Sequence, residues 1–177
     1  MTVAARLAVG LFLAAAACSQ SRQSEAKQLA PEFNLEGVRF RVWRGAELRA
    51  RGEARQVTIL RDTTETSAMD LRAEMPRAGG NVTITAPAGE GVLNSSTFTA
   101  HGGVVLTRGD ARATTDRATY TPAPDGSSAR ITGREPVEVV RPGFRLDGIG
   151  FSYDLATDVL DLGEPVEARF ARSGGAR

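Results

Sequence analysis

The sequence contains very few of the residues from which catalytic and metal sites are usually built. Its 177 residues include one cysteine, Cys18, and one histidine, His101. A single cysteine cannot form an internal disulfide, and metal sites made of several cysteines or histidines are excluded. His101 precedes a Gly-Gly pair at the start of an expected strand, which favours a turn or edge position over a catalytic one. We therefore expect no metal, no cofactor and no enzymatic activity.

A surplus of charge is also absent. The chain has 22 basic and 21 acidic residues, and Lys27 is its only lysine. Nucleic-acid binding depends on a surplus of cationic side chains that displace counterions from phosphates, so the composition predicts no nucleic-acid partner. It contains no polybasic patch for an anionic membrane surface either. With 41% hydrophobic and 24% charged residues, the chain can form one hydrophobic core in a single domain.

The sequence has only one long apolar stretch, and it is too short to span a bilayer. Leu7–Ala17 follows Arg6 and precedes Cys18, whereas a transmembrane helix needs about 20 apolar residues. This layout predicts a signal peptide over residues 1–17. The end of the stretch, AAAC, resembles the lipobox of bacterial lipoproteins, in which the cysteine is acylated and becomes the first residue of the mature chain.

Acylation of Cys18 would attach the protein to a membrane, because two or three acyl chains hold a protein stably. Lipoboxes usually have leucine three residues before the cysteine, where this chain has Ala15. Cleavage by the ordinary signal peptidase, which leaves a free thiol, therefore stays open. We expect residues 18–32 to be a lipidated cysteine followed by a flexible tether, because the residues after Cys18 are polar. We expect the folded domain over residues 33–172 and a disordered tail over residues 173–177.

Beyond the tether, apolar residues recur two positions apart in short runs. Alternation of this kind places apolar side chains on one face of a β-strand. Residues 64–75 fit a helix and a strand equally well. Clusters of Gly, Pro, Asp and Asn at 78–81, 88–91, 122–126 and 141–143 predict turns of an antiparallel all-β fold. The alternating runs include Val38/Phe40/Val42, Val57/Ile59, Val82/Ile84, Val104/Leu106, Val137/Val139 and Phe144/Leu146.

These strands also repeat. Residues 82–106 align without gaps on residues 144–168, at a shift of 62, and a middle copy lies at a shift of 33. The tetrapeptide Glu-Pro-Val-Glu at 135–138 recurs at 164–167, at the remaining shift of 29. The unit is a strand pair of about 30 residues. Stacked hairpins of this kind predict a curved sheet or a flattened, twisted roll, because each unit buries one apolar face only against its neighbours.

A β-bulge is predicted within the last repeat. Phe144 and Leu146 share one apolar parity, and Ile149 and Phe151 share the other. The run Gly-Ile-Gly at 148–150 supplies the backbone freedom that bulges use. We therefore expect the strand to bend there.

The last repeat resembles the LptC family of lipopolysaccharide-export proteins. Residues 141–167, RPGFRLDGIGFSYDLATDVLDLGEPVE, match the family's recurrent rhythm of glycine, leucine, Gly-x-Gly, Tyr-Asp, leucine and valine. Residues 38–50 and the run Gly-Gly-Val at 102–104 fit the same pattern. The resemblance covers about residues 38–170 and is shared with the soluble LptA-like member of the same bridge. A single short domain behind an anchor signal favours the membrane-attached member.

The resemblance implies an open β-jellyroll that carries lipid within a bridge across the periplasm. Such a protein receives lipopolysaccharide from an inner-membrane ABC transporter, whose permease carries β-rolls, and passes it to a soluble LptA-like protein by edge-strand addition. It would be periplasmic and lipid-anchored at the inner membrane. Well-known members have an uncleaved transmembrane helix instead of a lipobox, so the membrane that holds the anchor stays open.

The apolar strand residues have two interpretations. A groove lined by them would shelter acyl chains, at about 0.8 kcal/mol per buried methylene. The same side chains would also form the closed core of a β-roll that scaffolds envelope partners without binding lipid, which is the main alternative. The candidate residues of the lipid-binding groove, besides Cys18 as the lipid anchor, are Ile84, Phe98, Val104, Leu106, Ile131, Val137, Val139, Leu146, Phe151, Leu160 and Val166.

Two groups of charged residues have further interpretations. Six arginines between residues 39 and 55 fit phosphate contact, although charged residues in strands also solvate faces and protect edges. Two acidic pairs fit a glycosidase, which would make the chain an enzyme, but alternating strand positions favour solvated side chains. These residues are Arg39, Arg41, Arg44, Arg49, Arg51 and Arg55, and the pairs Asp158/Asp161 and Glu164/Glu167.

Overall fold

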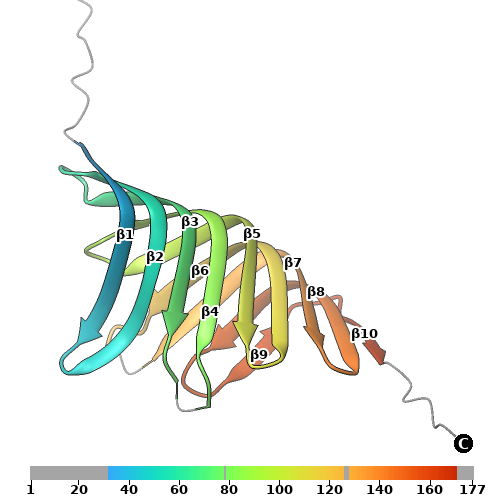
Figure 1. Ribbon diagram of the computed structural model, residues 1–177. Coiled ribbons are helices and arrows are strands. Elements are labelled where there is room, and N and C mark those ends of the chain that lie inside the picture. Colours follow the sequence, from blue (N-terminus) through green and yellow to red (C-terminus); the bar gives the residue numbers. More distant parts are fainter. Residues whose placement is uncertain (1–31, 78, 126–127, 171–177) are drawn as a thin grey trace, which may run out of the picture.

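Ten strands make up the part of the chain that the computed structural model describes, which is residues 32–77, 79–125 and 128–170 (Figure 1). No helix occurs within these residues, and the stretch 65–75, which also fitted a helix, is a strand. The strands are β1 Glu32–Arg44, β2 Glu47–Leu60, β3 Glu65–Met75, β4 Val82–Val92, β5 Thr97–Arg108, β6 Ala111–Pro122, β7 Ala129–Arg141, β8 Phe144–Asp154, β9 Val159–Leu162 and β10 Glu167–Phe170.

All ten strands belong to one antiparallel sheet that does not close. Each strand from β1 to β8 pairs with the next, and β8 pairs with both short last strands. β9 lies along the Phe151–Asp154 half of β8, and β10 lies along the Phe144–Asp147 half. Among the described residues, the outer edges of β1, β9 and β10 have no partner strand. The predicted all-β, open β-jellyroll is confirmed.

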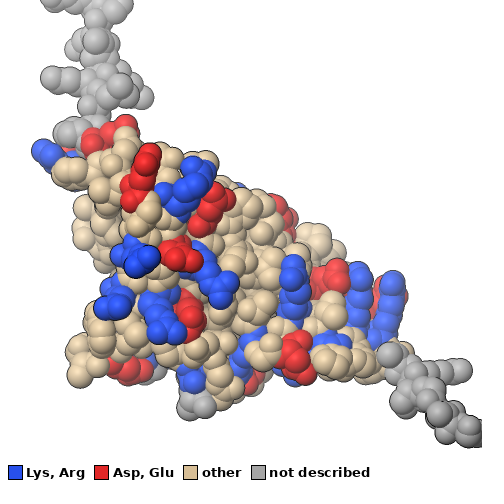
Figure 2. Space-filling view, in the orientation of Figure 1, with Lys and Arg blue, Asp and Glu red and all other residues tan. Residues whose placement is uncertain are grey.

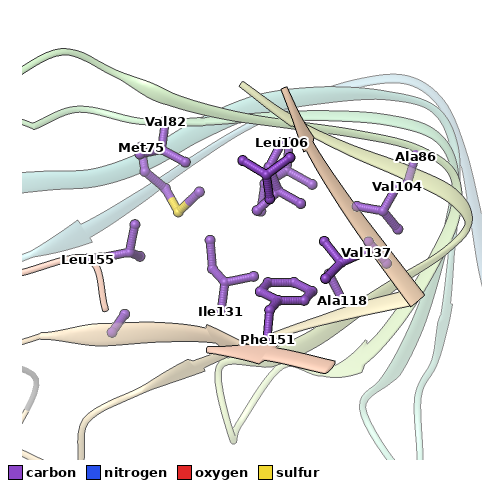
Figure 3. Close-up of a cluster of buried hydrophobic side chains, with 14 residues drawn as sticks. Met75, Val82, Ala86, Val104, Leu106, Ala118, Ile131, Val137, Phe151 and Leu155 are labelled. Carbon is purple, nitrogen blue, oxygen red and sulfur yellow. The ribbon is translucent and has the colours of Figure 1, made fainter. Parts of the chain in front are cut away.

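A row of irregularities crosses the sheet near the middle of its strands. The pairing register shifts after Thr85 in β4, His101 in β5, Thr115 in β6 and Gly133 in β7. An extra residue in one strand bends that strand and increases its twist. The strands therefore curve over (Figure 1), and buried side chains from opposite parts of the sheet converge in a common core (Figure 3).

The irregularity predicted near residues 148–150 of β8 is confirmed and belongs to this row, although the extra residue lies on β7, where residues 134 and 135 face Gly150 alone. Gly150 has a φ of +77°, and the register between β7 and β8 shifts opposite it, between Gly133 and Pro136. Ile149 differs from the prediction, because it is 50% exposed while Phe151 is 6% exposed. The inward parity resumes only after the bulge, so Ile149 faces outward.

Three of the four predicted turns lie where consecutive strands connect. The prediction of a turn at 88–91 is wrong, because β4 continues through these residues to Val92. Gly89 and Gly91 in this segment lie against the ring of Phe98 in β5, so they serve close packing instead of chain reversal.

Phenylalanine rings on the inner face lie against glycines of the adjacent strand. Phe98 lies against its cross-strand partner Gly91, and Phe151 lies against Gly133. A Cβ atom at Gly133 would be 2.8 Å from the Arg117 carbonyl oxygen and 3.0 Å from Cδ1 of Phe151. Glycine is therefore required at this position by the close approach of the neighbouring strands. The third pair of this kind is Phe40 and Gly52.

The inner face carries two apolar clusters. The larger one draws on β3 to β8 and on Leu155 just beyond β8, and its largest fully buried side chains are Val82, Val104 and Ile131. Full burial of such side chains contributes about 1.5–3 kcal/mol each. The smaller cluster joins β2 and β3 and consists of Ala54, Val57, Ala68 and Leu71.

The predicted repeats correspond to the hairpins β4–β5, β6–β7 and β8 with β9 and β10. In the third copy the second strand is interrupted between Leu162 and Glu167. Within this gap Gly163 donates a 2.9 Å hydrogen bond to the Gly150 carbonyl. The interruption therefore lies beside the β8 bulge, at the same level as the bulges of the earlier copies.

We expect Gly133→Ala to destabilise the fold by about 1–3 kcal/mol, because the new methyl group overlaps the Phe151 ring and the Arg117 carbonyl. Urea unfolding monitored by circular dichroism measures the change. The control is Thr132→Ala, one residue earlier on the same strand, which we expect to cost less than about 1 kcal/mol. Equal stability of Gly133→Ala and the wild type would contradict the proposed close approach.

Candidate functional site

Most of the predicted groove residues lie together inside the folded sheet. The structure brings seven of them into the larger apolar cluster, where five are labelled in Figure 3. Leu146 and Leu160 are partly buried and pack against this cluster. The seven buried residues are Ile84, Val104, Leu106, Ile131, Val137, Val139 and Phe151.

Two predicted groove residues lie elsewhere. Phe98 packs against the smaller cluster of β2 and β3. Val166 lies between β9 and β10 and is 47% exposed, whereas its repeat equivalent Val104 is fully buried, so its place in the groove stays a prediction. The interrupted last strand has no further strand beside it, so nothing in the sheet covers Val166.

The centre of the interior is packed. Val104 and Ile131 have no exposed surface, and Val137 is 2% exposed. Side chains packed to this degree fill the space between the halves of the sheet. Lipid entry at the centre would therefore require these contacts to part.

The interior is more accessible at β1. Phe33 and Leu35 are 47% and 44% exposed, although they are in register with inward-facing Ile59 and Val57 of β2. Val38 and Phe40 further along the strand are partly buried against the smaller cluster. The missing neighbour beyond β1 leaves this apolar surface uncovered. The groove prediction missed these residues because they lie outside the aligned repeats, although their alternation marks the same inner face.

The other end of the sheet also exposes apolar surface beside an ionic network. Phe170 in β10 is 75% exposed and lies 6.4 Å from the ring of Phe144 in β8. On the outer face of β8, Arg145 pairs with Asp147 at 2.9 Å and with Glu138 at 3.1 Å. Hydrogen bonds from Arg145 lower the pKa of Asp147. Exposed ion pairs of this kind add little stability, but charges near a free edge discourage indiscriminate strand pairing.

The six arginines that were candidates for phosphate contact lie in different environments. Arg39, Arg41 and Arg51 line a surface hollow of about 660 Å³ over β1–β3, where Arg72 joins them. Figure 2 shows positive and negative groups interleaved on this surface. The remaining members of the set are Arg44, which donates to the Asp125 carbonyl; Arg55, which pairs with Asp70 at 2.6 Å; and Arg49, whose Nε is buried.

Two tyrosines lie at the ends of β6 and β8 near three arginines. Arg108 donates a 3.0 Å hydrogen bond to the Tyr153 hydroxyl. Burial raises the pKa of both Tyr120 and Tyr153, and positive charges oppose the rise: Arg77 and Arg49 at Tyr120, Arg108 and Arg77 at Tyr153. Both tyrosines therefore keep their hydroxyl protons at neutral pH.

One carboxylate of each acidic pair is engaged with an arginine. Asp158 forms an ion pair with Arg108 and accepts a hydrogen bond from Tyr153. Glu167 pairs with Arg169 at 2.9 Å. In the described part of the chain, no group of three or more His, Cys, Asp and Glu residues is placed to hold a metal ion.

The predicted signal peptide, Cys18 and the tether up to residue 31 lie outside the described residues, as do residues 171–177. Within the described ranges, no helix is both long enough and apolar enough to cross a membrane.

The fold and the site define an open β-jellyroll protein with an apolar interior and free sheet edges. A family model described as lipopolysaccharide-assembly, LptC-related, matches residues 1–171. The chain therefore belongs to the LptC-related family, as its last repeat predicted. A search of the curated proteins finds no match. Membership implies a role in lipopolysaccharide transport, in a periplasmic component associated with the inner membrane.

Proposed function

We propose that this protein receives lipopolysaccharide from an inner-membrane ABC transporter and passes it to the next β-roll of a transenvelope bridge. The observation that carries the proposal is the unclosed sheet, whose apolar inner face continues to the exposed strand β1. This apolar inner face can bury acyl chains, and the free edge of β1 can pair with a strand of another β-roll. The chemistry needs no catalytic residue.

Acyl chains would enter first where the inner face is uncovered. Leu35, Val38 and Phe40 provide apolar contacts there without disruption of the central packing. Each methylene that leaves water contributes about 0.8 kcal/mol. Deeper entry, toward Phe98 and Leu146, would exchange protein–protein contacts for protein–lipid contacts of similar free energy, so that the lipid is held without being trapped.

Neighbouring β-rolls would join through the free edges. Within the described ranges, β1 presents an unpaired edge over 13 residues, and β9 and β10 present four residues each. Strand addition satisfies the free backbone donors and acceptors of such an edge and extends the apolar inner face across the junction. The partners are the β-rolls of the transporter's permease and a soluble LptA-like protein.

The packed centre favours a second candidate function. With Val104 and Ile131 fully buried, the domain is also suited to act as an envelope scaffold that joins β-rolls without carrying lipid. The two functions predict different contacts between lipid and inner-face residues.

We expect photo-crosslinking residues at Phe40, Phe98 and Leu146 to capture lipopolysaccharide in cells, because all three side chains belong to the inner face. Position 114 on β6 is the control and should capture none, since Thr114 is exposed on the outer face, next to Ala113, which packs against the core. Adducts are measured by immunoblotting against lipopolysaccharide. Absence of adducts at all three inner positions would support the scaffold.

We expect Leu35→Lys to weaken assembly with neighbouring β-rolls while the domain stays folded. Leu35 is 44% exposed, so the stability should change by no more than about 0.5 kcal/mol, whereas a charge in a joined apolar face is costly. Asn34→Lys adds the same charge to the outer face and should leave assembly intact. Co-purification of the permease and the LptA-like protein measures the effect, and wild-type yields of both with Leu35→Lys would refute the edge model.

We expect Cys18→Ser to release the protein from membranes, because the substitution removes the site of acylation. Cell fractionation and metabolic labelling with a fatty acid measure the change. A second variant, Ser19→Ala, preserves the cysteine and should remain bound. Continued membrane association of Cys18→Ser would show that the anchor has been assigned wrongly.

A further inference from the structure

We propose that Arg49, Arg77 and Arg108, with Tyr120 and Tyr153, bind a phosphate group of the lipid headgroup at the boundary of the apolar interior. These five residues are called the arginine–tyrosine cluster below. The proposal rests on the proposed function and specifies which part of the lipid this end of the domain recognises.

The cluster joins segments that are distant in the sequence. Arg108 ends β5, yet it bonds to Tyr153 near the end of β8. It also reaches the loop between β3 and β4, because a Cβ at Gly79 would lie 2.7 Å from Nη2 of Arg108. Arg77 belongs to this loop, and its charge acts on both tyrosines. The fold therefore gathers the cluster from five elements: β2, the β3–β4 loop, β5, β6 and β8.

The charges and N–H donors of the three arginines are only partly paired with acceptors. The Nε atoms of Arg49 and Arg77 are buried and find no hydrogen-bond partner among the described residues. Arg49 pairs with Glu47 at 3.0 Å, and Arg108 pairs with Asp158, whereas Arg77 has no ion pair within the described part of the chain. A buried donor without a partner costs about 1–3 kcal/mol. An anion bound between the arginines would remove this cost.

The donors match the needs of phosphate. Guanidinium groups form paired, charge-assisted hydrogen bonds with phosphate oxygens. The protonated hydroxyl of Tyr120 adds a neutral donor, whereas Tyr153 donates its proton to Asp158 and holds Arg108 in place by accepting its hydrogen bond. The carboxylates that face the cluster, Glu47 and Asp158, balance two of the three arginine charges and leave a net positive site.

The cluster also lies beside the apolar interior. Met75 precedes the loop that holds Arg77, Val82 follows it, and Leu155 precedes the turn that holds Asp158. Figure 3 shows Met75, Val82 and Leu155 at one end of the buried core. A lipid whose phosphate contacted the cluster would therefore have apolar surface within reach of its acyl chains.

The test compares the affinity of the full-length protein for bisphosphorylated lipid A and for the same lipid after removal of its phosphates. We expect Arg77→Gln to weaken binding of the phosphorylated lipid about tenfold or more, and binding of the dephosphorylated lipid by less than about twofold. Arg49→Gln should act in the same direction. The control, Arg112→Gln, removes an exposed arginine of β6 and should leave both affinities unchanged.

A second readout separates binding from folding. Without lipid, Arg77→Gln should melt at a temperature no lower than the wild type, because it removes a cation whose buried Nε has no partner. A purely structural Arg77 predicts a lower melting temperature and equal losses of affinity for both lipids, and this result would overturn the inference.

The remaining outcomes are also decisive. If the wild type binds both lipids and Arg77→Gln changes neither affinity, the phosphate site is wrong while the proposed function stands. If the wild type binds neither lipid, the proposed function itself fails. An equal loss of affinity for the phosphorylated lipid with Arg112→Gln would show that only the net charge of the protein matters, and this would overturn the phosphate site. Inorganic phosphate that binds alone as tightly as the lipid would assign the site to free phosphate and overturn the lipid assignment.

Discussion

The bend along the middle of the sheet is the constraint on which the rest of the structure depends. A flat antiparallel meander of ten strands would leave one apolar face in water. Because the register shifts at neighbouring positions in β4 to β8, the bends add up across the sheet instead of cancelling. The inner face then closes on itself, and Val104 and Ile131 become fully buried. Glycines at Gly52, Gly91 and Gly133 make room for the rings that line this bend.

The same bend explains why the domain has both a stable core and uncovered surface. Packing is densest where the halves of the sheet oppose each other, and it declines toward β1 and β10, where no further strand follows. Exposed edges of this length are a hazard for aggregation unless they are paired or protected. Pairing with the strands of other β-rolls would cover these edges and join the proteins, which agrees with membership of the LptC-related family.

Much of this fold was predictable, and the reasons lie in particular residues. Alternation at Ile84, Leu106 and Val137 marked the inner face, and the parity change near Gly150 marked a bulge. The turn expected at 88–91 failed because glycine serves two purposes, chain reversal and close packing, which composition does not distinguish. Val166 is more exposed than its repeat equivalent Val104 because, among the described residues, the last copy lacks a further neighbouring strand.

The sequence by itself determined the strands, their repeat and their inward faces, since alternation and turn chemistry act between residues close in the chain. It also determined the family, through the rhythm of the last repeat. Only the tertiary structure decided that the centre is packed while β1 is uncovered, that Arg108 meets Tyr153, and that the charge of Arg77 acts on Tyr120 and Tyr153. These features depend on how far the sheet bends and on which strand ends it brings together. Such contacts span from roughly thirty to over seventy residues, beyond the range of any local pattern.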